Sequence, residues 1–186
     1  GTLFGAAFAK NLASILVKFG LIFVDPLHHG LKSLAAPIYA DSIEKSNEIV
    51  TEIRNKSSEL ESEGFHAQVH VEEDYFPLFW HDDVGRRTAL RKVEDNLYRA
   101  KDGKQEFSLT TLAEIAKNEP QRLSPGVMLR PVVQDFLFPT VCYFGGAAEI
   151  GYFAQNSEAY RILGRPLTRI LHRQSFTIVE AKHRRT

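Results

Sequence analysis

The chain has 186 residues, a length that holds one sizeable domain or a core with an appended lobe. Its 23 Lys and Arg are balanced by 23 Asp and Glu, so no general basic field attracts nucleic acid or an acidic membrane. Apolar runs such as LASILV fall far below the roughly 20 residues that cross a bilayer. The single cysteine, Cys142, excludes an internal disulfide framework and a Cys-rich metal site. We therefore expect a cytoplasmic globular protein whose partners include neither nucleic acid nor membrane.

The two ends of the chain predict an internal segment of a longer protein. The chain opens at Gly1 rather than at Met, and its first residues already show the spacing of an amphipathic helix. At the other end, residues 181–186 (AKHRRT) lie where a further, basic helix is expected to start.

The first part of the chain predicts a helix, a buried strand and a second, long helix. Apolar residues recur at helical spacing from Phe4 to Phe19, and Gly20 supplies a C-cap. The run LIFV at 21–24 lacks alternation and ends at an Asp-Pro pair, which indicates a strand buried on both faces. Residues 37–63 form a predicted helix that ends at Gly64, with one thin apolar stripe and an otherwise solvated surface.

Residues 65–128 predict a β-rich inserted lobe. HAQVHV alternates and FPLFW is aromatic, and turn signals follow at 94–96 and 102–103. This pattern is typical of a meander of short antiparallel strands, which we expect to run to about residue 107. Ser108 then caps a helix, LTTLAEIAKN, which Pro120 terminates.

Residues 129–180 predict a return to an α/β pattern. A short helix, PVVQDFLF, is closed by Pro139, and TVCYF follows as a buried strand. The pair Gly145-Gly146 makes a tight turn into a helix that starts with AAEIGYFAQ, and LTRIL and SFTIVE are predicted as further strands. The order strand, Gly-Gly, helix recurs where α/β sheets bind ligands at the carboxyl ends of strands. The predicted fold class is therefore α/β, with a core formed by 1–64 and 129–180 and interrupted by the lobe.

The Gly-Gly turn is the first candidate binding site. Free amides at the start of the following helix would favour a carboxylate or a phosphate, and Glu149, one turn into the helix, could bind an amine such as an α-ammonium group. The alternative is a plain strand-to-helix turn in which Glu149 only complements the helix dipole.

A polar trio, Arg130, Gln134 and Asp135, lies among apolar residues just before this turn. On a helix, Arg130 and Gln134 are one turn apart, with Asp135 beside them. The trio is either a buried structural ion pair or the lining of a polar pocket. Tyr143 and Gln155 add hydrogen-bonding groups near the same turn.

Metal binding is not predicted. The histidines at 28, 29, 66, 70 and 81 fit no established metal-site spacing, and His66 and His70 lie on a predicted strand where their side chains diverge. Cys142 is predicted to be a small apolar strand residue, since no His or Asp stands beside it in the sequence to activate its thiol.

Several separated segments together resemble the cysteine-adding enzymes of bacillithiol biosynthesis, the BshC family. The matching segments are FGAAFAKNLASILVKFGLIFVDP, LKSLAAPIY, GFHAQVHV, PQRLSPGVMLRPVVQDFLFPTVCYFGGAAEIGYFAQ and SFTIVE. They occur in the family's order and cover nearly the whole chain. Two departures occur: GGAAE stands where the family commonly has GGPAE, and HRQS stands for PRAS, so that Arg173 and Ser175 persist.

The resemblance implies a partial Rossmann-like core of the class I synthetase and nucleotidyltransferase type. Residues 65–128 would be a connecting-peptide insertion, and 181–186 the start of a coiled coil. The complete enzyme would be a homodimeric ligase that joins L-cysteine to glucosaminyl-malate, with ATP as the implied activator and no metal in the protein. The family's Gly-rich amino-terminal motif and first Rossmann half would precede Gly1, so we expect no catalysis by this segment alone.

The residues expected to border the substrate pocket are those that match the family's core motif, and none of them is assigned as an acid or a base. They are Arg130, Gln134, Asp135, Tyr143, Gly145, Gly146, Glu149 and Gln155. Two alternatives stay open. One is a related adenylylating or nucleotidyl-transferring enzyme with another acceptor, and the other is a truncated, non-catalytic binding module.

Overall fold

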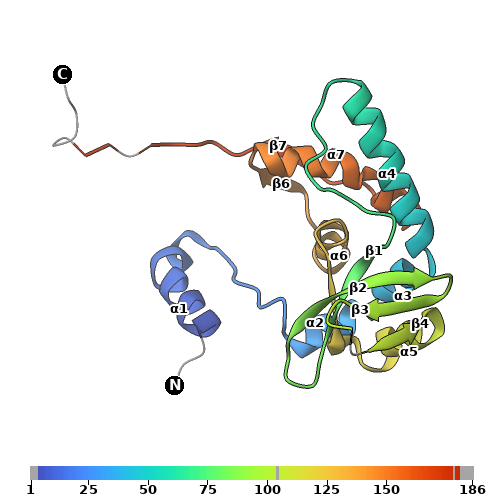
Figure 1. Ribbon diagram of the computed structural model, residues 1–186. Coiled ribbons are helices and arrows are strands. Elements are labelled where there is room, and N and C mark those ends of the chain that lie inside the picture. The colour runs from blue at the N-terminus through green and yellow to red at the C-terminus, as the bar shows by residue number, and fades with distance from the viewer. Residues whose placement is uncertain (1–3, 104, 178, 181–186) are drawn as a thin grey trace.

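The computed structural model describes residues 4–103, 105–177 and 179–180. Its helices are α1 (Phe4–Leu16), α2 (His29–Leu34), α3 (Ala36–Glu44), α4 (Ser46–Ser62), α5 (Leu109–Asn118), α6 (Arg130–Leu137) and α7 (Ala147–Ile162), with 3-10 turns η1 (Val17–Phe19) and η2 (Pro120–Arg122). Its strands are β1 (Tyr75–His81), β2 (Arg87–Glu94), β3 (Leu97–Ala100), β4 (Glu106–Ser108), β5 (Leu123–Pro125), β6 (Cys142–Gly145) and β7 (Arg169–His172). Figure 1 shows that the strands form two separate sheets.

The larger sheet is antiparallel, in the order β4-β3-β2-β1-β5. Strands β1 to β4 follow one another in antiparallel pairs, which confirms the predicted meander of short strands. Asn96 makes the β2–β3 turn with φ +63°. Strand β5 returns beside β1 after the helix α5, so the sheet takes in residues well beyond 107. The predicted strand HAQVHV is wrong: residues 66–71 have no strand conformation.

The helix α5 has the bounds that Ser108 and Pro120 predict from the sequence. The Ser108 hydroxyl accepts the Thr111 N–H at 3.0 Å, satisfying an amide that has no partner inside the helix. Leu112 and Ala116, one turn apart, are fully buried and turn the same face toward the core. The helix ends at Asn118, two residues before Pro120, as predicted.

The core lies between the larger sheet and the helices α3, α4 and α5. Ile43, Ile49 and Ile53 are at most 1% exposed, so the thin apolar stripe predicted for residues 37–63 is confirmed. The prediction of one continuous helix is wrong, because the chain breaks at Lys45. The Lys45 ammonium donates to the carbonyl of Ile162 at 3.1 Å, and the break lets α3 pack on α5 while α4 packs on α7.

The second sheet contains the parallel pair β6–β7, joined by α7. Tyr143 pairs with Ile170 and Gly145 with His172, so the carboxyl ends of the two strands lie side by side. This strand–helix–strand unit confirms the predicted α/β pattern. The expectation that β6 is buried is wrong: Val141 is 86% exposed and Phe144 64% exposed. Within the described residues, β7 covers one edge of β6 and α7 covers one face.

Two other predicted strands are wrong. Residues 21–24 have no regular structure, and Ile22 is 88% exposed; the described residues after His172 form no strand either. A strand needs a neighbouring strand to share its hydrogen bonds, and no strand of the described chain pairs with either segment. Figure 1 shows α1 and the segment that follows it standing apart from the rest, with the carboxyl-terminal segment extending away. The predicted start of a coiled coil, at 181–186, lies outside the described residues.

Candidate ligand site at the Gly-Gly turn

The Gly-Gly turn joins the carboxyl end of β6 to the amino end of α7. Gly145 is the last residue of β6 and Gly146 is the N-cap of α7. Just after β7, the Arg173 N–H donates to the Gly145 carbonyl at 2.9 Å, which fixes Arg173 beside the turn. A Cβ added to Gly146 would lie 3.1 Å from the Arg173 guanidinium, so a glycine at 146 lets that cation approach the backbone.

Glu149 is held as a carboxylate over this turn. Its two side-chain oxygens accept the Gly146 N–H at 2.8 Å and the Tyr143 hydroxyl at 2.7 Å. These two hydrogen bonds, with the nearby Arg173 and Arg130 guanidinium groups, lower the pKa of Glu149 below its usual value. The pKa of Tyr143 is raised by burial and by its hydrogen bond to Glu149, so the phenol stays protonated. The Glu149 side chain is 28% exposed, so a ligand can reach it.

Two cations flank this carboxylate. The Arg173 guanidinium lies 4.0 Å from Glu149, and Arg130 donates to the hydroxyl of Tyr152 at 3.0 Å. Arg130 lies at the amino end of α6 and is exposed. A carboxylate with guanidinium groups nearby matches a zwitterion, whose ammonium pairs with the carboxylate and whose own carboxylate pairs with a guanidinium group.

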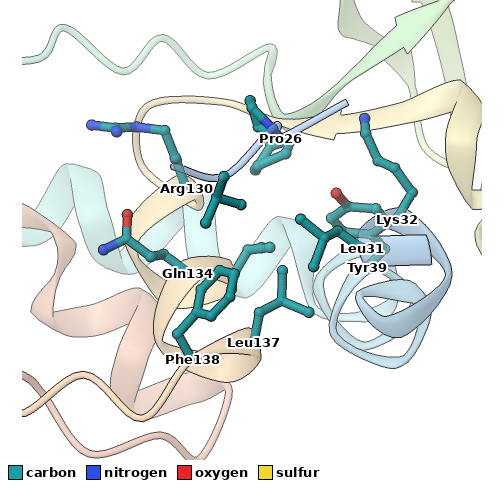
Figure 2. Close-up of a pocket in the computed structure, with 11 residues that line it drawn as sticks. Pro26, Leu31, Lys32, Tyr39, Arg130, Gln134, Leu137 and Phe138 are labelled. Atoms are coloured by element: carbon teal, nitrogen blue, oxygen red, sulfur yellow. The ribbon is translucent and has the colours of Figure 1, made fainter. Parts of the chain in front are cut away.

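A cavity of about 440 Å³ lies on the other side of Arg130. Figure 2 shows Arg130 and Gln134 of α6 on one wall and Lys32 of α2 on the opposite wall. Apolar side chains line the cavity between the two walls. The lining residues are Val24, Pro26, Leu31, Lys32, Tyr39, Pro125, Arg130, Val133, Gln134, Leu137 and Phe138. Arg130 therefore lies both at this cavity and near the Gly-Gly turn.

The predicted polar trio separates in the structure. Gln134 lines the cavity, but Asp135 accepts the Tyr160 hydroxyl at 2.5 Å and the Thr168 hydroxyl, and so ties α6 to α7 and to the start of β7. No ion pair joins Asp135 to Arg130 among the described residues. Five positions along a helix rotate a side chain by about 140°, which directs the two groups to different neighbours. The idea of a buried Arg–Asp pair is therefore wrong.

Gln155 lies away from the turn and the cavity. Its side chain is fully buried, and its amide donates to the Val69 carbonyl at 2.9 Å and to the Ser57 hydroxyl at 2.8 Å, and accepts the Val69 N–H at 3.0 Å. These bonds hold the irregular segment 65–71 against α4 and α7. The structure thus brings Tyr143, Gly145, Gly146 and Glu149 together with Arg130, and it gives Gln155 a packing environment instead.

Two neighbours of the site were not selected from the sequence. Arg173 belongs to the HRQS segment and directly follows β7, which is parallel to β6. Because parallel strands end at the same edge of a sheet, its position after a predicted strand could have indicated that it lies near the Gly-Gly turn. Lys32 could not be identified from the sequence, because a lysine in LKSLAAPIY looks like an ordinary surface residue.

Within the described ranges, no three His, Cys, Asp or Glu side chains gather as metal ligands, and no helix is long and apolar enough to span a membrane.

The fold is that of an α/β protein, and the turn is a candidate small-ligand site at the carboxyl ends of two parallel strands. Residues 2–174 match the family described as "Bacillithiol biosynthesis BshC, N-terminal Rossmann-like domain". The chain belongs to this family.

Curated relatives named cysteine ligase BshC support the same assignment. The relative from Koribacter versatilis is 38% identical over 183 residues, 98% of this chain and 34% of that protein. The relative from Solibacter usitatus is 34% identical over 182 residues, 98% of this chain and 33% of that protein. A relative from Salinibacter ruber is 35% identical over the same share of this chain. The chain spans about one third of the length of these relatives.

Proposed function

We propose that this chain is a piece of the amino-terminal Rossmann-like domain of a ligase that adds L-cysteine to glucosaminyl-malate in bacillithiol biosynthesis. The family match over residues 2–174 and the names of the relatives support this proposal. The proposal includes the properties that the family resemblance implies for the complete enzyme: a cytoplasmic location, a homodimer with a coiled coil, and low-molecular-weight thiol metabolism. Because the chain is a third of its relatives' length, we assign activity to the complete protein.

The observation that carries the proposal is the partly exposed Glu149 carboxylate, which has the Arg173 guanidinium at 4.0 Å and the charge of Arg130 nearby. In our proposal the α-ammonium of cysteine pairs with Glu149, and its carboxylate pairs with Arg130 or Arg173. The Tyr143 hydroxyl and the Gly146 N–H hold the Glu149 side chain in one position. Amide formation then requires the acceptor amine within about 3–3.5 Å of the activated carboxyl carbon, so a fixed amino acid removes much of the entropic barrier.

ATP is the activator that the resemblance implies, and it would convert the unreactive cysteine carboxylate into a derivative with a good leaving group. The turn itself does not fit a triphosphate. The N–H of Gly146 already donates to Glu149, and the negative charge of that carboxylate at the amino end of α7 repels a phosphate. We therefore assign the turn to the amino acid.

The first test is Glu149→Gln in the complete protein to which this chain is proposed to belong. The substitution keeps the size of the side chain and removes the charge that pairs with the ammonium. We expect the KM for L-cysteine to rise roughly 10- to 100-fold, with the KM for glucosaminyl-malate little changed. Steady-state kinetics with each substrate varied in turn measures this. The matched control is Glu158→Gln on the same helix, where the carboxylate pairs with Arg161 at the surface. An unchanged KM for cysteine in the Glu149 variant would refute the assignment.

The second test separates this ligase from an adenylylating enzyme with another acceptor. Thiols are profiled in a host that lacks the complete gene. Loss of bacillithiol together with accumulation of glucosaminyl-malate supports the ligase. Normal bacillithiol in that host contradicts it.

A further inference from the structure

Lys32 is the least expected side chain of the cavity. It lies on α2 and is 3% exposed, and its ammonium donates to the Leu123 carbonyl on β5. An ammonium group has three N–H donors, and a carbonyl oxygen neutralises no charge. No carboxylate forms an ion pair with Lys32 in the part of the chain that the structure describes. A buried cation without an acidic partner is costly, so proteins rarely keep one without a use.

The groups around Lys32 add positive charge or are neutral. The Arg87 guanidinium donates to the Ser124 hydroxyl at 3.0 Å and to the Pro125 carbonyl at 3.0 Å, just behind the wall of the cavity. His81 shares the Ser124 hydroxyl at 2.7 Å, and the Tyr39 phenol lines the same cavity. Burial raises the pKa of Tyr39 to about 12, which keeps that phenol neutral.

We propose that this cavity is a binding site for a small ligand whose acidic group, a carboxylate or a phosphate, pairs with the Lys32 ammonium. Apolar walls formed by Leu31, Val133, Leu137 and Phe138 surround the body of the ligand. The site is distinct from the Gly-Gly turn, and the proposal uses the ligase function only to choose one of the probes.

The size and the charge of the cavity support this assignment. A volume of about 440 Å³ lies within the range of small-molecule sites, and an apolar lining with few polar groups is typical of them. Arg130 and Gln134 form part of the opposite wall, and Figure 2 shows their polar ends directed away from the space between the walls, so Lys32 is the charged group assigned to the ligand. Burial and the charge of Arg87 lower the pKa of Lys32 to about 8, a change that a bound anion reverses.

The test measures the titration of Lys32 directly. The chain is labelled with [13Cε]lysine, and the Lys32 resonance is assigned by its loss in Lys32→Met. Separate titrations use L-malate, a dicarboxylate, and inorganic pyrophosphate. We expect one of the two anions to raise the pKa of Lys32 by about one unit or more at saturation. A response to malate alone identifies a carboxylate ligand, and a response to pyrophosphate alone identifies a phosphate ligand.

Variants complete the test by calorimetric titration with the responding anion. Lys32→Met is expected to bind it about tenfold more weakly or worse, and Lys32→Arg, which keeps the charge, to retain measurable binding. The control is Lys56→Met, a partly exposed lysine on α4 paired with Glu59, and it should bind like the unchanged chain. Near-UV circular dichroism checks that each variant is folded. If neither anion moves the Lys32 resonance, or if Lys32→Met binds as tightly as the unchanged chain, the proposal is overturned. Ligase activity is not measured, so failure of the ligase proposal leaves this result unaffected.

Discussion

Lys32 lowers the stability of the fold that contains it, because its ammonium is buried without an acidic partner. The pKa of Lys32 falls from 10.5 to about 8 on folding, which corresponds to a penalty of about 3 kcal/mol when the group is charged. At pH 7 the lysine is charged in both the folded and the unfolded chain, so the full penalty is present. Between pH 8 and 10.5 the folded chain loses the proton first, and stability rises with pH.

We predict that Lys32→Met raises the free energy of unfolding at pH 7 by about 1–3 kcal/mol. Methionine keeps the packing of the stem and removes the charge, although the bond to the Leu123 carbonyl is lost. The advantage should shrink above pH 8 and vanish near pH 10.5. Urea unfolding at several pH values measures it. A variant that is less stable than the unchanged chain at pH 7 would mean that Lys32 stabilises the fold.

At the scale of elements, Gly126 joins the larger sheet to α6. Its N–H donates to the Pro77 carbonyl on β1 at 2.7 Å, and its own carbonyl accepts the Arg130 N–H at 2.8 Å. A Cβ at position 126 would lie 2.6 Å from the Tyr75 hydroxyl oxygen and 3.1 Å from the Pro77 carbonyl oxygen. We predict that Gly126→Ala lowers the free energy of unfolding by about 1–3 kcal/mol, since β1 cannot move away without breaking its own pairing. Thermal unfolding checks this. Gly5→Ala, whose new Cβ meets nothing within 4 Å, is the control and should not destabilise.

Elements with local signals could be predicted from the sequence. The Ser108 cap and Pro120 fixed both ends of α5, and the Gly-Gly pair fixed the start of α7. The strand predicted at residues 21–24 is absent, because an apolar run becomes a strand only beside another strand. The presence of that neighbour depends on distant parts of the chain. The break between α3 and α4 at Lys45 also involves a distant contact, the hydrogen bond from Lys45 to the Ile162 carbonyl at the end of α7. The residues around Lys45 do not reveal that contact.

The candidate site followed the same rule. The residues within one turn of Gly146, Tyr143 and Glu149, could be found from their spacing. The separation of Asp135 from Arg130 could not be predicted from the sequence, because Asp135 accepts hydrogen bonds from Tyr160 and Thr168, which lie far along the chain.

At the scale of the whole molecule, α1 and residues 21–24 present apolar side chains to solvent. Helix α1 buries no residue, and Phe8 and Ile15 are more than half exposed. Exposed apolar surface of this extent binds hydrophobic dyes. We predict that the chain enhances the fluorescence of anilinonaphthalene sulfonate, and that the double variant Phe8→Glu, Ile22→Glu lowers the enhancement without changing the unfolding temperature. Equal fluorescence from both proteins would show that these side chains are covered.

The three hydrogen bonds of the Gln155 side chain affect which sequence changes the segment 65–71 tolerates. One carboxamide offers Val69 the donor and the acceptor that a neighbouring strand would otherwise offer, so the segment around Val69 needs no strand of its own. Any residue except proline presents the same backbone N–H and carbonyl to the carboxamide, so these bonds select little else in the sequence. Selection comes instead from Gly151, one turn earlier on α7, where a Cβ would lie 2.4 Å from Gln68. Inserted residues should therefore be tolerated between Gly64 and Ala67, and rejected between Gln68 and Val69.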